Sequence, residues 1–104
     1  MVPKPNLQKI FYTDQAKADL AYWLKEDPKK LQKISELIES TMADPTKGIG
    51  LPKPLKYSLE GAWSRRISHE HRLVYTFTAT TLNILQARPK SITGSCVPVF
   101  TIWS

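Results

Sequence analysis

The sequence predicts an α+β fold in which an N-terminal strand and two helices precede an antiparallel sheet meander. Three patterns predict it: a short β-type run at residues 9–12, apolar residues at helical spacing between 14 and 43, and three alternating β-rich runs between 62 and 87. Because helices and strands are segregated along the chain, the helices are expected to pack on one face of the sheet. The 104 residues fit a single domain, residues 1–104, with one modest core.

The first helix is predicted from a capping signal and an apolar stripe. Residues 1–8, which contain two prolines, are expected to be a flexible lead-in, and residues 9–12 (KIFY) follow as a short strand. Thr13 or Asp14 then offers an N-cap, and the helix is expected to run to about Glu26. Its apolar side chains recur at helical spacing: Ala16, Leu20, Trp23 and Leu24.

The second helix has a clear start and a clear end. Asp27-Pro28 combines an N-cap residue with proline at the first helical position. The apolar stripe that follows consists of Leu31, Ile34, Leu37, Ile38 and Met42. Pro45 and the pair Gly48 and Gly50 end the helix, and the chain is expected to be irregular as far as Pro54.

The sheet is predicted from the second half of the chain. An extended stretch is expected at 54–59, and strands at 62–67, 71–78 and 81–87, joined by short polar turns. One side of the 71–78 strand carries Leu73, Tyr75 and Phe77, which predicts the face that joins the core.

The positive charge is concentrated in the second half of the chain. Residues 1–46 hold seven Lys against seven Asp and Glu, whereas residues 47–90 hold eight Lys and Arg against two Glu and so supply the whole net charge of +6. Residues 91–104 carry no charged side chain. Such an uneven field indicates a polyanionic partner, either a nucleic acid or an acidic protein segment.

Two arginines are the leading candidates for an anion site. They lie in the run GAWSRRISHEHRLVY, residues 61–75. Strand alternation places Arg66 on the same side as Ser64, and Arg72 on the same side as Val74, away from the predicted core face. A guanidinium group binds phosphate bidentately and stays charged at any working pH. The alternative is that both arginines only keep a solvated strand edge soluble.

Composition also disfavours several classes of protein. The single cysteine, Cys96, excludes an internal disulfide and a Cys-based zinc site. No His/Asp/Glu cluster has metal-ligand spacing, so neither a metal nor a cofactor is expected. No apolar run is long enough to span a membrane and no signal peptide is evident, so a cytoplasmic protein without membrane contact is expected. Trp23 and Trp63 are of a type that stacks on bases, but packing accounts for them more simply.

Several segments of the chain resemble one known family. GIGLPKPLK at 48–56, GAWSRRI at 61–67 and EHRLVY at 70–75 are similar to motifs of the YoeB/Txe branch of the RelE toxin superfamily. The upstream segments 9–23 and 29–41 fit the same pattern in the same order, so the resemblance covers roughly residues 9–88. It implies a RelE-like fold related to the microbial ribonucleases.

The resemblance also implies an activity and partners. Members of that family are ribosome-dependent endoribonucleases that cut messenger RNA in the A site. They form homodimers and are held inactive by a YefM-like antitoxin with a disordered acidic segment.

The family pattern gives the basic residues provisional roles. Arg66 and Arg72 match the paired arginines that grip phosphate and stabilise the transition state. Arg65 faces the other way and is expected to be structural or to contact the RNA backbone. Further RNA contacts are expected from Lys56, Arg88 and Lys90.

The general acid and base are where the chain departs from the family. Lys53 stands in the loop where the family has glutamate, its general base, and Arg88 is followed by Pro89 rather than by the family's terminal Tyr-His-Tyr. Residues 91–104 form a divergent tail. A lysine acting as base at neutral pH would need its pKa lowered by roughly 3 units from about 10.4. Lys53 and Lys90 therefore either act electrostatically or are solvated charges in a damaged site.

Three functions follow from these observations. The first is an active ribosome-dependent endoribonuclease, with Arg72, Arg66 and Lys53 as the catalytic residues. The second is a catalytically impaired protein of the same fold that binds antitoxin or ribosome without cutting. The third, a general basic RNA-binding module, is least favoured because the chain lacks an aromatic- and glycine-rich ribonucleoprotein motif.

Overall fold

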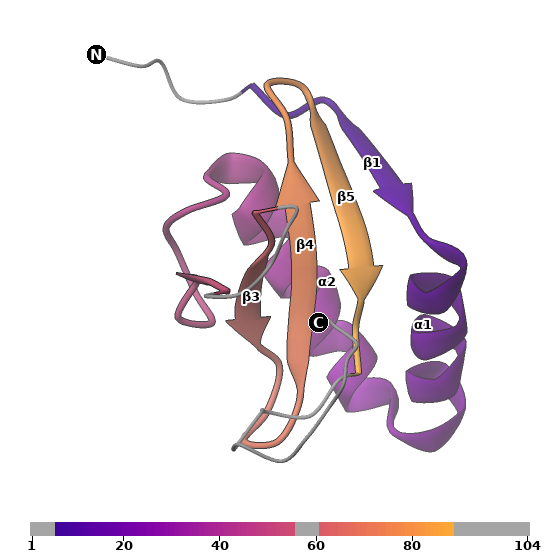
Figure 1. Ribbon diagram of the computed structural model, residues 1–104. Coiled ribbons are helices and arrows are strands. Elements are labelled where there is room, and N and C mark those ends of the chain that lie inside the picture. The colour runs from indigo at the N-terminus through magenta and orange to yellow at the C-terminus, as the bar shows by residue number, and fades with distance from the viewer. Residues whose placement is uncertain (1–5, 56–60, 89–104) are drawn as a thin grey trace.

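A mixed sheet with two helices against one of its faces forms the body of the protein (Figure 1). The computed structural model describes residues 6–55 and 61–88. The elements in this part of the chain are β1 (Lys9–Tyr12), α1 (Asp14–Glu26), α2 (Pro28–Ala43), β2 (Lys53–Pro54), β3 (Trp63–Arg66), β4 (Arg72–Phe77) and β5 (Thr81–Gln86).

The strands lie in the order β1-β5-β4-β3-β2. The expected antiparallel meander of β3, β4 and β5 is confirmed. The N-terminal strand β1 pairs in parallel with β5, with Ile10 opposite Leu82, and this pairing makes the sheet mixed. The two helices carry the chain from β1 at one edge of the sheet to β2 at the other edge.

The core lies between the helices and the inner face of the sheet. Trp23 of α1 and Ile34 and Leu37 of α2 are buried against the side chains that the sheet contributes. Those side chains are Leu73, Tyr75, Leu82 and Ile84. The predicted core face of β4 is therefore confirmed, and Arg66 and Arg72 project from the opposite face.

Residues 6–8 are held against the turn between β4 and β5. We expected residues 1–8 to be flexible, but the backbone of Asn6 donates to the Ala79 carbonyl at 3.0 Å and that of Gln8 to the Thr80 carbonyl at 2.8 Å. Leu7 is buried in the core. The expectation was wrong for residues 6–8 because the turn between β4 and β5 offers carbonyls that a sequence pattern cannot reveal.

Both helices begin after a predicted N-cap residue, but only Thr13 makes a capping hydrogen bond. The Thr13 hydroxyl accepts from the Ala16 amide at 3.0 Å and donates to the Leu85 carbonyl at 2.6 Å, so one side chain caps α1 and joins it to the end of β5. Asp27 precedes Pro28 as expected, but its carboxylate makes no capping bond and accepts instead from Lys30 at 3.0 Å.

The strand bounds agree with the prediction within one residue at each end for the meander. The extended stretch expected at 54–59 is represented by β2 at 53–54, and residues 56–60 lie outside the described part of the chain. No helix among the described residues is long and apolar enough to cross a membrane.

Candidate functional site

The hairpin of β3 and β4 places two guanidinium groups side by side. Arg66 and Arg72 are direct cross-strand partners, in the pair of the β3–β4 ladder nearest the turn. The turn itself is closed by the His71 carbonyl, which accepts from the Ile67 amide at 2.9 Å and the Ser68 amide at 3.2 Å. Like charges directly opposite in a sheet repel one another. An anion lying near both groups would relieve this repulsion.

Arg72 is held in position by the turn, whereas Arg66 is exposed. The Nη1 atom of Arg72 donates to the Ser68 carbonyl at 3.1 Å, and to the His71 carbonyl at 3.4 Å. Partial burial, and then the charge of Arg66, lower the pKa of Arg72 from its usual range. An arginine remains a cation at neutral pH despite such a shift. The pair therefore presents one positive charge bound to the turn and one exposed positive charge.

Lys53 lies on the same face as the arginine pair. It is the cross-strand partner of Ser64 and is exposed. Because Ser64 is two residues before Arg66, alternation points Lys53 and Arg66 to the same side of the sheet. Neighbouring strands lie about 5 Å apart and residues i and i+2 about 7 Å apart, so the three cations fall within the span of one phosphodiester and its neighbour.

Arg65 occupies the inner face and is fully buried, with 0% of its surface exposed. Its guanidinium donates to the phenol of Tyr75 and to the helix–loop segment that follows α2. Of the two roles expected for Arg65, the structural one fits. Direct contact with the RNA backbone was wrong, because no part of this guanidinium reaches the surface.

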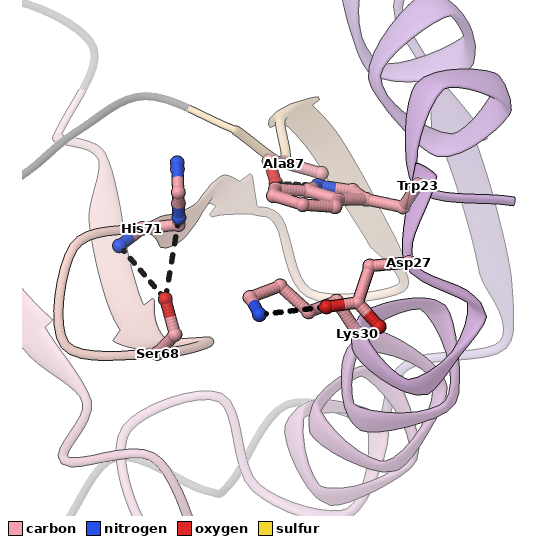
Figure 2. Close-up of polar contacts among 6 residues, drawn as sticks. All are labelled: Trp23, Asp27, Lys30, Ser68, His71 and Ala87. Atoms are coloured by element: carbon pink, nitrogen blue, oxygen red, sulfur yellow. Dashed lines mark hydrogen bonds and ion pairs between the residues drawn. The ribbon is translucent and has the colours of Figure 1, made fainter. Parts of the chain in front are cut away.

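A second group of side chains lies where β5 ends, beside the hairpin turn (Figure 2). The Ala87 carbonyl accepts from Trp23 Nε1 at 2.9 Å, and the Ala87 amide donates to Asp19 Oδ2 at 2.9 Å. The ring of His71 meets the Trp23 ring edge to face at 4.9 Å between centroids, and its Nδ1 lies 3.2 Å from Ser68 Oγ. Helix α1 thus fixes the place where the chain leaves the sheet.

Arg88 follows this anchored residue and is exposed. Its guanidinium carbon lies 4.0 Å from the centroid of the Tyr22 ring, a cation–π contact that holds the side chain against α1. Since Gln86 pairs with Val74, Arg88 lies at the same end of the sheet as Arg72. The other two expected RNA contacts, Lys56 and Lys90, lie outside the described residues.

Asp19 was not among the residues predicted from the sequence. Its carboxylate is 3% exposed and also accepts from Gln15 Nε2 at 2.8 Å. A signal was present, because Asp19 lies three residues after Ala16 and four before Trp23, on the apolar stripe of α1. A carboxylate at such a position needs buried donors. Within residues 6–55 and 61–88, no group of three or more His, Cys, Asp or Glu side chains is arranged to hold a metal ion.

Comparison with known proteins gives consistent matches over most of the chain. A family model described as "YoeB-like toxin of bacterial type II toxin-antitoxin system" matches residues 12–90. Toxin YoeB of Escherichia coli strain K12 is 44% identical over 80 residues, covering 77% of this chain and 95% of that protein. Toxin YoeB of Streptomyces coelicolor is 45% identical over 80 residues, with the same two coverages.

Solved structures give the same picture at the level of the fold. The YoeB dimer from Staphylococcus aureus superposes with a TM-score of 0.74 at 40% identity, over 80% of this chain and 95% of that one. The heterotetrameric YoeB–YefM toxin–antitoxin complex from the same organism gives 0.71 at 41% identity, over 79% and 94%. A mutant of YafQ from Escherichia coli, at 21% identity and a TM-score of 0.60 over 79% and 93%, shares the fold alone.

Proposed function

The chain belongs to the family of YoeB-like toxins of bacterial type II toxin–antitoxin systems, and from that membership we propose that it is a metal-independent endoribonuclease acting on messenger RNA at the ribosome. The observation that carries the proposal is the pair Arg66 and Arg72, cross-strand partners on the face of the sheet opposite the core. Two guanidinium groups at this spacing suit a phosphate whose negative charge increases during reaction.

The reaction that these groups would serve is attack by the ribose 2′-oxygen on the adjacent phosphorus. The 2′-hydroxyl loses its proton to a base, the bond from phosphorus to the 5′-oxygen breaks, and that oxygen takes up a proton. The products are a cyclic 2′,3′-phosphate and a free 5′-hydroxyl. Arg66 and Arg72 would neutralise the two negative charges of the phosphorane-like transition state, with Lys53 adding positive charge from β2.

We also propose partners and a location. The matched structures include a YoeB dimer and a YoeB–YefM complex, which supports a homodimer and a YefM-like antitoxin for this chain. An antitoxin with an acidic segment would be attracted to the face that carries Lys53, Arg66 and Arg72. Action on ribosome-bound messenger implies a cytoplasmic location.

A second candidate function is supported by Lys53 itself. Lys53 is exposed on β2, and the resemblance of the loop motif implies that the family has its carboxylate base at this position. A protein with the arginine pair but without a base would bind antitoxin, and would occupy the ribosome, without cutting.

The experiment that separates the two functions maps messenger 5′ ends after purified protein is added to translating ribosomes. We expect cuts at A-site codons that fall by a hundredfold or more in rate in Arg72→Ala, since one such contact is worth about 3 kcal/mol. Lys25→Ala, a change at an exposed cation in the last turn of α1, is the control. Uncut messenger at saturating protein, with antitoxin binding intact, would establish the binding function instead.

A further inference from the structure

The buried guanidinium of Arg65 has a hydrogen-bond partner for every donor. An arginine has five N–H groups, and five acceptors surround this one. Nε donates to Tyr75 Oη at 3.1 Å, Nη1 to Ser40 Oγ at 2.9 Å and the Ile49 carbonyl at 3.0 Å, and Nη2 to the carbonyls of Asp44 at 2.6 Å and Lys47 at 2.9 Å. A charge at 0% exposure is tolerated only with such complete pairing.

The acceptors gather the segment that connects α2 to β2. Three of them are backbone carbonyls of residues 44–49, which we call the arginine-bound loop, and a fourth is the Ser40 hydroxyl near the end of α2. Two further bonds close the arrangement: Tyr75 Oη donates to the Pro45 carbonyl at 2.6 Å, and the Ile49 amide donates to Ser40 Oγ at 3.2 Å. The loop is therefore wrapped around one side chain of β3.

The glycines of this region are required by the same contacts. Gly48 has φ +123°, and a Cβ there would overlap Ser40 Oγ and lie 3.1 Å from Arg65 Nη1. Gly50 has φ +83°, and a Cβ there would lie 2.6 Å from Leu37 Cδ2 and 3.1 Å from the Cβ of Arg65. Both residues combine a left-handed backbone with close approach to Arg65 or its partners, a combination that glycine alone accepts without strain.

The loop leads directly to the candidate catalytic lysine. The amide of Arg66 donates to the Gly50 carbonyl at 2.6 Å, which fastens the end of the loop to β3. Leu51 follows with φ 52°, a conformation that costs a non-glycine residue energy and persists only where its surroundings enforce it. Two residues later Lys53 enters β2 opposite Ser64.

We propose that Arg65 is a positioning residue whose guanidinium sets the arginine-bound loop and, through Gly50 and Leu51, the place of Lys53 beside Arg66 and Arg72. This inference rests on the proposed function only for its consequence in RNA cutting. The claim that Arg65 sets the shape of the loop rests on the hydrogen bonds of Arg65 and does not depend on activity. Adjacent arginines of β3 thus serve opposite faces: Arg65 organises the loop from within, and Arg66 meets phosphate outside.

A local measurement tests the structural part. Amide hydrogen exchange is compared in wild type, Arg65→Lys and Ser40→Ala, with Thr41→Val as a matched control that removes a neighbouring buried hydroxyl bond, from Thr41 Oγ1 to the Leu37 carbonyl at 2.6 Å. The informative amides are those of Lys47 and Arg66, whose acceptors lie at or beside the loop, at Asp44 and Gly50. We expect exchange at least tenfold faster at these amides in both loop variants and unchanged in the control.

Two results of the exchange experiment would contradict the proposal. Faster exchange spread evenly over β4 and β5 would mean that Arg65 contributes only to global stability, and unchanged exchange at the two amides would mean that the loop holds its shape without Arg65. Ser40→Ala keeps the experiment decisive if Arg65→Lys does not fold. Exchange needs no activity, so an inactive wild type would count against the proposed function and not against this inference.

Coupling to Lys53 tests the consequence for function. If Arg65 acts through the loop, Arg65→Lys should slow messenger cutting in the wild-type background and have little further effect in Lys53→Ala. Fully additive losses in the double variant would contradict the proposed route through Lys53.

Discussion

At the scale of single residues, neighbouring arginines of the same strand have entirely different surroundings. Alternation along β3 buries Arg65 among five acceptors and leaves Arg66 exposed opposite Arg72. The sequence predicted which of these arginines faces outward, because period-two alternation needs no tertiary information. It could not predict the acceptors of Arg65, which come mainly from a loop whose path depends on Arg65 itself.

Lys53 gives the sharpest prediction at this scale. If the chain lacks a strong base, Lys53→Glu restores a carboxylate on the face of Arg66 and Arg72 and should raise the cutting rate about a hundredfold or more, since general-base catalysis is usually worth roughly 10²–10⁴. Lys53→Gln, which removes the charge without adding a base, is the matched control. Single-turnover cutting of ribosome-bound messenger measures both, and a slower Lys53→Glu enzyme would show that Lys53 contributes through its positive charge.

Tyr75 makes stability depend on alkaline pH. Burial, opposed by the hydrogen bond and charge of Arg65, raises the pKa of the Tyr75 phenol, so the folded state favours the protonated form. Its contribution to stability is therefore complete below about pH 10 and is lost as pH rises through the raised value.

We expect Tyr75→Phe to lower the free energy of unfolding by about 1–3 kcal/mol at pH 7, because the Pro45 carbonyl loses its donor and Arg65 Nε its acceptor. The difference from wild type should shrink above pH 10. Chemical denaturation at several pH values measures it, with Tyr22→Phe, an exposed tyrosine, as the control. A difference that stays constant to pH 11 would contradict the assignment.

At the scale of elements, helix α1 is tied to the end of β5 by polar contacts as well as by packing. Thr13 binds the Leu85 carbonyl at the start of the helix, and Asp19 and Trp23 hold both backbone groups of Ala87 further along. The capping role of Thr13 was predictable from sequence, whereas the register between α1 and β5 was not. A sequence pattern defines each element but does not state which strand a helix will meet.

This tie can be tested at Asp19. Asp19→Ala leaves the buried Ala87 amide without an acceptor and should lower the free energy of unfolding by about 1–3 kcal/mol, whereas Asp19→Asn keeps one acceptor oxygen and should cost less. Amide exchange at Ala87 should increase more than exchange at Ile84, which lies three residues earlier, in β5. Equal increases at both positions would mean that the contact has no local role.

At the scale of the whole molecule, the charge asymmetry of the sequence becomes a difference between two faces. The helices come from the neutral first half and cover one face of the sheet (Figure 1). The other face carries Lys53, Arg66 and Arg72. Element order, the meander and this polarity were predictable because they follow from local spacing and composition. The parallel pairing of β1 with β5 and the bound lead-in were not, because both depend on contacts between distant segments.

The polarity predicts how affinity for single-stranded RNA responds to salt. Three phosphate contacts should give a slope of log affinity against log salt of about −2, since each contributes about −0.7. Arg66→Ala should make the slope shallower by about 0.7, whereas Lys25→Ala, on the exposed side of α1, should leave it unchanged. Fluorescence anisotropy with a labelled oligonucleotide between 50 and 300 mM salt, about a sixfold range, measures it. Equal slopes in all three proteins would place the RNA on another surface.

The division of labour between residues 65 and 66 has a consequence for how such a gene can change. Under the proposed function, a substitution at codon 66 would impair cutting and leave a folded product whose attraction for an acidic antitoxin segment is reduced by one positive charge. A substitution at codon 65 would disturb the loop from inside the fold and expose the product to proteolysis. Substitutions at adjacent codons would thus have separate effects, loss of activity at codon 66 and loss of folded protein at codon 65.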